Sequence, residues 1–262
     1  RGEKSGNRIL NYATQTTRSP GSSIKPLSVY GPAMEYGEIT YTSVFDDAPF
    51  NFGVATKGEG GSIVYSNTHG WPANLPDRYA GLTSVYDALQ RSVNTIAVRI
   101  LDKLTMDRSF DYVKNKLHMD SFIESYTKAD GEVLSDKNMS ALALGGMNYG
   151  VTVLEMTAAY QIFPNGGIYN KARIVLEIQD SDGKTLVDNQ SDSSIVMSEQ
   201  TASIMTKMMQ NVVESPTGTA YKAVTLKSEV NCAGKTGTTT ADCDRWFMGF
   251  TPYYVGGVWF GY

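Results

Sequence analysis

The chain has 262 residues, of which 41% are hydrophobic and 19% are charged, and its formal net charge is −4. That length and composition predict a globular protein with a sizeable core, and the mild negative charge gives no sign of a nucleic-acid-binding surface. The sequence has no run of eighteen apolar residues that could cross a membrane, and no signal peptide is visible.

From the N-terminus, the first twenty residues are polar and rich in turn formers, and residues 22 to 165 have a mostly helical pattern with long loops. A helix is predicted to begin at Ser22, after a Pro-Gly turn. A later helix begins in "LTSVYDALQR" with Thr83 or Ser84 as its N-cap, and another, in "MTAAYQIFPNGG", ends at Pro164.

The rest of the chain changes pattern. "ARIVLEIQDSDGKTLVD" alternates around Asp182-Gly183, which predicts a hairpin, and a helix follows from about Ser198. The last thirty residues predict three antiparallel strands, in "GKTGTTT", "DRWFMGFTP" and "YYVGGVWFGY". This order of elements predicts an α+β fold. Apolar residues of the Ser198 helix form one predicted core-facing stripe: Ile204, Met205, Met208, Met209, Val212 and Val213.

Cysteine and histidine are scarce. The two cysteines, Cys232 and Cys243, lie close together, but a chain of this size does not need a disulfide. We therefore predict structural thiols rather than a disulfide or a shared metal site. His69 and His118 lack the spacing of metal motifs, so no metal or other cofactor is predicted. This scarcity also disfavours a Ser-His-Asp triad, and a nucleophilic serine would need another base.

The stretch "SPGSSIKPL" places Ser22 and Lys25 three residues apart. If a helix begins at Ser22, the hydroxyl and the amine are neighbours on one helix face, near the positive end of the helix dipole. Taken alone, the pair is better explained by a serine N-cap with a solvated lysine.

Two further short motifs follow. Ser92-Val93-Asn94 lies between two helical runs, where a polar connection with an Asn turn explains it well when taken alone. Lys235-Thr236-Gly237 begins a strand, so Lys235 and Gly237 share one face, and the glycine lets another backbone or a ligand approach closely. A phosphate-binding loop is excluded, because Glu229 stands where the Walker pattern needs glycine and a strand follows instead of a helix.

Each motif also recurs by chance. Ser125-Tyr126-Thr127-Lys128 is another S-x-x-K, and residues 4 to 7 imitate the other two motifs. The chosen set is distinguished by its order and context. Ser125 has no Pro-Gly turn ahead of it, and the imitations at Lys4 and Ser5 precede every candidate nucleophile.

The ordered set S-x-x-K, S-x-N and K-T-G occurs in serine β-lactamases and penicillin-binding proteins. Beyond these motifs, the sequence resembles the transpeptidase domain of class A, bifunctional penicillin-binding proteins over most of its length. The resemblance is carried by "NYATQTTRSPGSSIKPL", "GLTSVYDALQRSVNTIAVRIL", "LALGGMNYGVTVLEMTAAYQIFPNGG", "GTAYKAV" and "AGKTGTTTADCDRWFMGFTPYYVGGVWFGY".

This resemblance implies a penicillin-binding/serine β-lactamase-like α+β fold, with an antiparallel sheet, flanking helices and an all-helical half. One transpeptidase domain would fill residues 1–262, with a sheet half at roughly 1–21 and 168–262 and a helical half at roughly 22–167. Both ends are expected to be truncated relative to the family. The Tyr41–Asn67 region is expected to be an insertion of unknown purpose.

The resemblance further implies a peptidoglycan D,D-transpeptidase. Ser22 would attack a stem peptide ending in D-Ala-D-Ala and become acylated, with Lys25 as its base. Ser92 would relay a proton to the leaving amine, and Asn94 would hold Lys25 and the substrate amide. The amine of a second peptide would then resolve the acyl-enzyme, and β-lactams would acylate the same serine.

The backbone N–H groups of Ser22 and Thr238 correspond to the family's oxyanion hole. Lys235 is expected at the end of an exposed strand, where it stays protonated and, as a nearby cation, favours the neutral form of Lys25. The expected binding site for the substrate strand and its carboxylate consists of Lys235, Thr236, Gly237 and Thr238.

The expected partners are peptidoglycan stem peptides, nascent glycan strands and β-lactam antibiotics, and no nucleic acid. The resemblance also implies an upstream glycosyltransferase domain and a membrane anchor outside this chain, at the extracytoplasmic face of the bacterial membrane. One alternative is a serine β-lactamase, although Val93 replaces the Asp of the S-D-N form. The other is a non-catalytic sensor of β-lactams or muropeptides.

Overall fold

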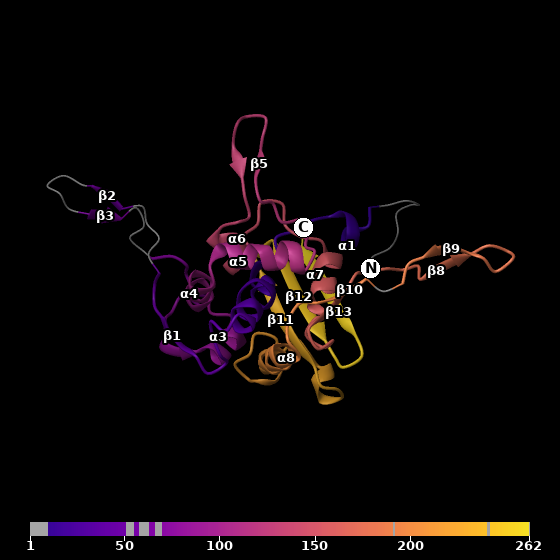
Figure 1. Cartoon of the computed structure of the whole chain (residues 1–262). Coiled ribbons are helices and arrows are strands. Elements are labelled where there is room, and N and C mark those ends of the chain that lie inside the picture. Colours follow the sequence, from indigo (N-terminus) through magenta and orange to yellow (C-terminus); the bar gives the residue numbers. More distant parts are fainter. Residues whose placement is uncertain are drawn as a thin grey trace.

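A three-stranded antiparallel sheet lies at the centre of the molecule, with helices packed against it (Figure 1). Its strands are β11 (Ala233–Thr238), β12 (Asp244–Phe250) and β13 (Val255–Gly261), and β12 is the middle one. The three strands predicted from the end of the sequence are therefore confirmed. The structure is a computed structural model, which describes residues 10–50, 55–57, 63–65, 70–190, 192–239 and 242–261.

Burial alternates along β12 as the pleat of a strand requires. Trp246, Met248 and Phe250 are buried, whereas Phe247 and Gly249, which lie between them, are only partly buried. One face of the sheet therefore packs into the core, and the register of β11 and β12 places Lys235 opposite Met248.

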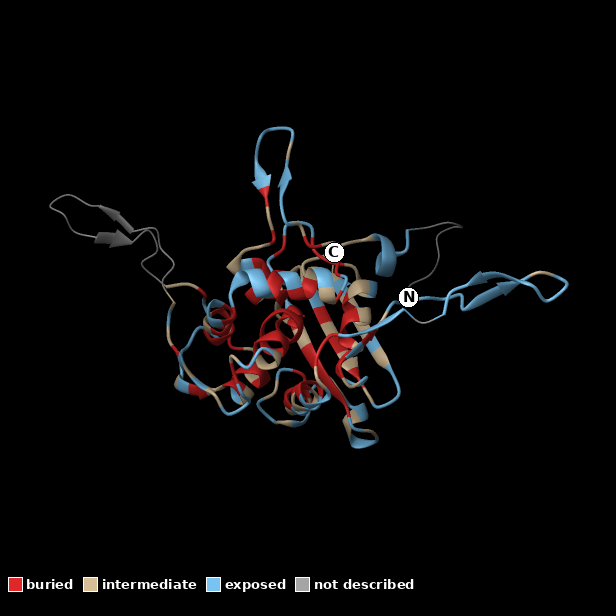
Figure 2. Cartoon of the chain, in the orientation of Figure 1, coloured by how far each residue is buried: buried red, intermediate tan, exposed pale blue. Residues whose placement is uncertain are grey.

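Helices supply most of the core. Figure 2 shows the buried residues gathered where the helices meet the sheet. The helical elements are α1 (Tyr12–Gln15), η1 (Gly21–Ile24), η2 (Pro26–Tyr30), α2 (Gly31–Glu35), α3 (Val85–Arg91), α4 (Asn94–Leu104), α5 (Met106–Asp111), η4 (Tyr112–Lys116), α6 (Met139–Leu144), α7 (Val153–Tyr160), α8 (Glu199–Glu214) and η5 (Leu226–Ser228).

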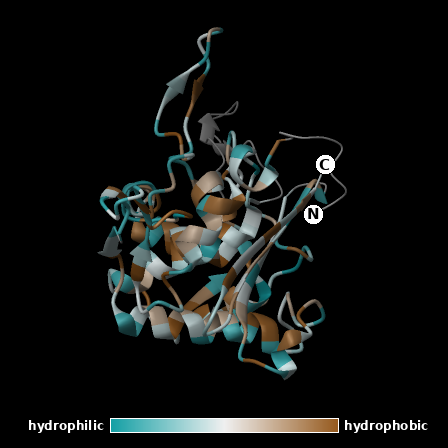
Figure 3. Cartoon of the chain, turned by 90° about the vertical axis from the view of Figure 1, so that its right-hand side faces the viewer, coloured by the Kyte–Doolittle hydropathy of each residue, from teal (hydrophilic) through white to brown (hydrophobic). Residues whose placement is uncertain are grey.

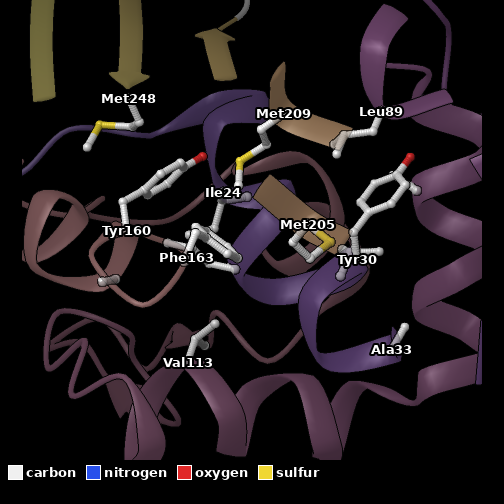
Figure 4. Close-up of a cluster of buried hydrophobic side chains, with 14 of the residues drawn as sticks. Ile24, Tyr30, Ala33, Leu89, Val113, Tyr160, Phe163, Met205, Met209 and Met248 are labelled. Carbon is white, nitrogen blue, oxygen red and sulfur yellow. The ribbon is translucent and has the colours of Figure 1, made fainter. Parts of the chain in front are cut away.

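The helical segment from Gly21 to Glu35 runs through the middle of this core. It begins as a 3-10 turn, widens to a π-helix after Lys25, and continues as an α-helix. Ile24 and Tyr30 are fully buried, and Figure 4 shows them among Met205, Met209 and other apolar side chains. The helix predicted at Ser22 is confirmed, and its apolar side chains are buried in the core.

The α8 helix is as predicted. Ser198 is its N-cap and accepts a hydrogen bond from the backbone N–H of Thr201 at 3.2 Å. The predicted apolar stripe faces the core, and only Ile204 among its six residues is partly rather than fully buried.

Paired strands project around this centre, and the β5–β6 and β8–β9 hairpins extend into solvent (Figures 1 and 2). The β8–β9 hairpin turns at Asp182-Gly183, as predicted. The peripheral strands are β1 (Val44–Asp47), β2 (Ala55–Lys57), β3 (Ile63–Tyr65), β4 (Gly81–Ser84), β5 (Tyr126–Thr127), β6 (Val133–Leu134), β7 (Ile168–Asn170), β8 (Glu177–Gln179), β9 (Thr185–Asp188) and β10 (Ser193–Ile195).

Two predicted helix boundaries are refined by the structure. Ser84 rather than Thr83 caps α3, because residues 81–84 form strand β4 against β1. The α7 helix ends at Tyr160, before Pro164, and turns occupy the residues between them. The division into a sheet half and a helical half stays a prediction.

Figure 3 shows the sheet and the helices from the side, as two adjoining layers. Among the residues that the structure describes, no helix has the length and apolar character needed to cross a membrane.

Candidate active site

The candidate nucleophile lies where the Gly21–Glu35 helical segment meets the β11 strand. Ser22 is half-buried in the first turn, directly after Gly21, whose φ is +53°. A Cβ atom at Gly21 would lie 2.6 Å from the carbonyl oxygen of Thr238. Only glycine allows both the positive φ angle and this close approach of the Gly21 backbone to Thr238. The turn therefore packs directly against the end of β11.

Lys25, one turn later, is fully buried. Its Nζ donates hydrogen bonds to the carbonyl oxygen of Ser92 at 2.8 Å and to Asn94 Oδ1 at 2.6 Å. Burial, and secondarily the nearby charge of Lys235, holds the pKa of Lys25 well below the usual range of a lysine. The neutral form of this amine, which can accept a proton, is therefore favoured relative to the solvated lysine of the simpler interpretation.

Ser92 lies in the tight connection between α3 and α4, in the left-handed conformation with φ of 60°. This conformation is unusual for a residue other than glycine and recurs at functional sites. Its Oγ accepts a hydrogen bond from Lys235 Nζ at 2.8 Å and lies 3.4 Å from Lys25 Nζ. The three motifs, far apart in sequence, thus meet at one hydroxyl between two amines.

Lys235 differs from the expectation. It is fully buried rather than exposed, and burial lowers its pKa to about 7. The prediction that Lys235 is exposed is therefore wrong, and with it the reason given for its staying protonated. The reason is tertiary packing: α8 and the 3-10 turn at Gly21 both contact β11, and sequence alternation alone cannot reveal that coverage.

Gly237 and the threonines follow the strand alternation. A Cβ atom at Gly237 would clash with the backbone of Pro20, so the close neighbour expected at this glycine is the turn before Ser22. Thr236 Oγ1 shares a hydrogen bond with Thr219 Oγ1 at 2.7 Å. Thr238, at the end of the strand, is exposed.

A cavity of about 510 Å³ opens at this junction and is lined by Ser22, Asn94 and Thr238. Sequence reasoning did not assign Trp71 or Gly145 to the site, although both also line this cavity. Trp71 stood out only as an aromatic residue in a Pro/Gly-rich loop, and Gly145 belongs to the "LALGG" stretch, whose pattern gives no chemical role.

The other serines of "SPGSSIKPL" have structural contacts. Ser19 Oγ donates to the carbonyl oxygen of Met147 at 3.2 Å, and the buried Ser23 Oγ donates to that of Pro20 at 2.7 Å. Both hydroxyls therefore hold the turn on which Ser22 is presented.

The two cysteines are not joined in a disulfide. Cys232 is buried just before β11, and burial raises the pKa of its thiol. Cys243 lines the cavity. Within the described part of the chain, no group of three or more His, Cys, Asp or Glu side chains could hold a metal ion.

Comparisons with known proteins identify the family and the fold. The family model described as penicillin binding protein transpeptidase domain matches residues 2–262. Penicillin-binding protein 1A of Clostridium botulinum is 34% identical over 98% of this chain, which spans 28% of that protein's length.

Among solved structures, penicillin-binding protein 1A from Haemophilus influenzae superposes with a TM-score of 0.72 at 24% identity, covering 97% of this chain and 39% of that one. The D,D-transpeptidase domain of a peptidoglycan glycosyltransferase from Eggerthella lenta superposes with a TM-score of 0.65 at 20% identity. That superposition covers 97% of this chain and 63% of that one. These likenesses support the predicted α+β fold, and the family match is decisive: the chain belongs to the penicillin-binding protein transpeptidase domain family.

Proposed function

We propose that this domain is a serine-type D,D-transpeptidase that cross-links peptidoglycan stem peptides through an acyl-enzyme on Ser22. One observation carries the proposal: a fully buried amine with a lowered pKa, Lys25, follows one turn after a serine that opens into the cavity. A serine needs an adjacent base to become a nucleophile, and a neutral amine is such a base.

In the proposed acylation, Ser22 Oγ attacks the carbonyl carbon of the penultimate D-Ala while Lys25 Nζ accepts the hydroxyl proton. The C–N bond to the terminal D-Ala then breaks, and that D-Ala leaves with a proton added to its amine. The hydrogen bond from Lys235 to Ser92, and the 3.4 Å between Ser92 Oγ and Lys25 Nζ, support Ser92 as the relay for this proton.

The developing oxyanion would be stabilised by the backbone N–H groups of Ser22 and Thr238, two residues that line the same cavity. Lys235, Thr236 and Thr238 would receive the terminal carboxylate of the substrate. A carboxylate favours the charged form of a nearby lysine, so substrate binding would raise the pKa of Lys235 from its value of about 7.

In the second step, the amine of another stem peptide attacks the acyl carbon, Ser22 Oγ leaves and recovers a proton, and the cross-link forms. A β-lactam would enter the first step and leave a long-lived acyl-enzyme. We also propose that the whole protein acts on nascent glycan strands at the extracytoplasmic face of the membrane, together with a glycosyltransferase domain. The support is the chain's family and its similarity to penicillin-binding protein 1A sequences.

Labelling with a fluorescent penicillin tests the acylation step. A long-lived covalent adduct is expected, whereas rapid release would identify a β-lactamase, and failure to label would contradict the proposal. Cross-linking of polymerised lipid II then separates a transpeptidase, which forms cross-links, from a sensor, which binds without turnover.

A further inference from the structure

The Tyr41–Asn67 region, whose purpose the sequence left open, contributes a buried carboxylate close to the site. Residues 51–54, 58–62 and 66–67 of this region lie outside the described residues. Asp47, the last residue of β1, is 2% exposed. Across the described ranges it has no ion-pair partner, so hydrogen bonds alone stabilise its buried charge.

Three donors surround the Asp47 carboxylate. Its Oδ1 accepts hydrogen bonds from Asn74 Nδ2 at 2.7 Å and Thr95 Oγ1 at 2.5 Å, and its Oδ2 accepts one from the backbone N–H of Ala80 at 2.9 Å. These donors belong to the loop before β4 and to the first turn of α4. Asp47 therefore holds that loop against the beginning of α4.

Asn74 is the next link. The side-chain nitrogen of Asn74 donates to Asp47, so the Oδ1 atom of Asn74 faces away from Asp47. This Oδ1 accepts from the backbone N–H of Asn94 at 2.9 Å and of Thr95 at 3.3 Å. The N-cap residue of α4, Val93, offers no side-chain cap, so Asn74 supplies the missing acceptor from outside the helix.

Asn94 completes the connection to the amine. Its Nδ2 donates to the carbonyl oxygen of Ala73 at 2.8 Å, and its Oδ1 accepts from Lys25 Nζ at 2.6 Å. The loop thus fixes the backbone of Asn94 through Asn74 and its side chain through Ala73. A continuous series of hydrogen bonds runs from Asp47 through Asn74 and Asn94 to Lys25.

We propose that Asp47 and Asn74 are positioning residues that hold Asn94, and through it the Lys25 amine, in the geometry needed for acylation of Ser22. The inference rests on the proposed function. In a purely structural role, the two residues would affect only the free energy of unfolding. As positioning residues, they also set the acylation rate constant of the folded protein.

An exchange of the two side chains separates these roles. Asn74→Asp places two carboxylates at a 2.7 Å contact, and Asp47→Asn removes the charge that orients Asn74. In the double variant, the amide of Asn at position 47 donates to Asp at position 74, whose other oxygen still accepts from the N–H groups of α4. The hydrogen bond from Asn74 Nδ2 to the carbonyl oxygen of Arg78, at 3.1 Å, is lost in this variant. The side-chain carbonyl oxygen of Asn at position 47 accepts the hydrogen bond from the backbone N–H of Ala80. The Thr95 hydroxyl can accept a hydrogen bond from the side-chain NH₂ of the same Asn.

The readout is the rate constant of acylation by a fluorescent penicillin, with the noncovalent Kd obtained from its concentration dependence. Each single variant should lower the rate constant roughly 10- to 100-fold, because a small displacement of a catalytic group has effects of this size. The double variant should recover most of this loss, because the contact between positions 47 and 74 is restored and only the hydrogen bond to Arg78 stays broken. Should a single variant not fold, Asn74→Ala replaces it, with the same expected loss.

The chain offers a matched control. Asp136 is fully buried and also accepts from an asparagine amide, Asn148 Nδ2, at 2.7 Å, and from the backbone N–H of Ile123 at 3.0 Å. None of its hydrogen bonds reaches Lys25 or α4. Asp136→Asn should lower stability and change the rate constant less than about twofold.

The inference is overturned if folded single variants acylate at the wild-type rate, if the exchange restores nothing, or if Asp136→Asn slows acylation as much as Asp47→Asn. Wild-type protein that is not acylated would instead contradict the proposed function.

Discussion

Ser22–Lys25 and Ser125–Lys128 carry the same S-x-x-K pattern in two regions of the molecule with opposite surroundings. Lys25 is fully buried against oxygens from the start of α4, and its pKa is lowered by burial and by Lys235. Lys128 lies on the β5–β6 hairpin, where its hydrogen bond to Glu132 raises its pKa.

The comparison shows that the residue pattern alone does not create a base. The lowered pKa of Lys25 requires the buried environment and the neighbouring amine, both of which come from distant parts of the chain. On the β5–β6 hairpin, the lysine of the same S-x-x-K motif is charged and forms a surface ion pair. The hairpin is therefore an internal control for the site.

The largest effect is expected for Lys25→Arg. A guanidinium stays protonated in proteins, so it cannot accept the Ser22 proton. Acylation by penicillin should fall by roughly 10²- to 10⁴-fold, the usual contribution of a general base. Lys128→Arg should leave the rate unchanged. Stopped-flow or gel-based labelling measures both, and a Lys25→Arg protein that acylates almost normally would reduce Lys25 to an electrostatic role.

Lys235→Gln is expected to lower the acylation rate roughly 10- to 100-fold, in line with the loss of about 1.5–3 kcal/mol for a hydrogen bond to a charged group. It should also change the pH dependence. Acylation rises with pH as Lys25 loses its proton, and below about pH 7, where Lys235 is charged, that charge lowers the pKa of Lys25. Removing that charge raises the pKa of Lys25, so the rising part of the curve of acylation rate against pH should move to higher pH.

Rates measured between about pH 5 and 9 test this shift. Lys128→Gln is the control and should leave the curve in place. A curve that stays in place or moves to lower pH in Lys235→Gln would show that the two amines are not electrostatically coupled.

Lys235→Met should remove the amine that acylation needs but raise the free energy of unfolding. The pKa of Lys235 is about 7 in the folded protein and 10.5 in its ordinary state, so the unfolded chain binds more protons between these values. Burial of Lys235 therefore lowers the free energy of unfolding by its full amount below about pH 7, and this destabilisation disappears as pH rises toward 10.5. Urea unfolding should therefore show a larger gain for Lys235→Met near pH 6.5 than near pH 10. An equal gain at both would contradict a titrating buried lysine.

The smallest effect is expected at the hairpin itself. Lys128→Ala removes a surface ion pair with Glu132 and should change the acylation rate less than about twofold, with little change in thermal stability. A marked loss of acylation would mean that the hairpin takes part in the reaction, and the comparison between the two motifs would fail.

Much of the site was predictable because local signals and fold agree. The three motifs, the β11–β13 strands and the helix from about Ser198 follow from periodicity, glycines and helix-start residues, and the structure brings Lys25, Ser92 and Lys235 together. The nucleophile could be separated from its imitation at Ser125 only by context.

The rest depends on contacts between residues distant in sequence. An aspartate that ends a short strand and an asparagine in a Pro-rich loop look like ordinary turn residues, so nothing in the sequence joins Asp47 to Asn74. The burial of Lys235 was missed for the same reason, because α8 and the turn at Gly21 that cover it lie far away along the chain.

The most direct test locates the penicillin adduct by mass spectrometry. Trypsin does not cleave before proline, so Ser22 lies in the peptide from Ser19 to Lys57, and Ser125 lies in the peptide from Leu117 to Lys128. We predict one adduct, placed at Ser22 by fragmentation, that disappears in Ser22→Ala and persists in Ser125→Ala. Ser22→Ala should remain folded, because Ser22 is not the N-cap of its helix and its replacement removes no capping hydrogen bond. An adduct in the Leu117–Lys128 peptide, or undiminished labelling of folded Ser22→Ala, would contradict the assignment of Ser22 as the nucleophile.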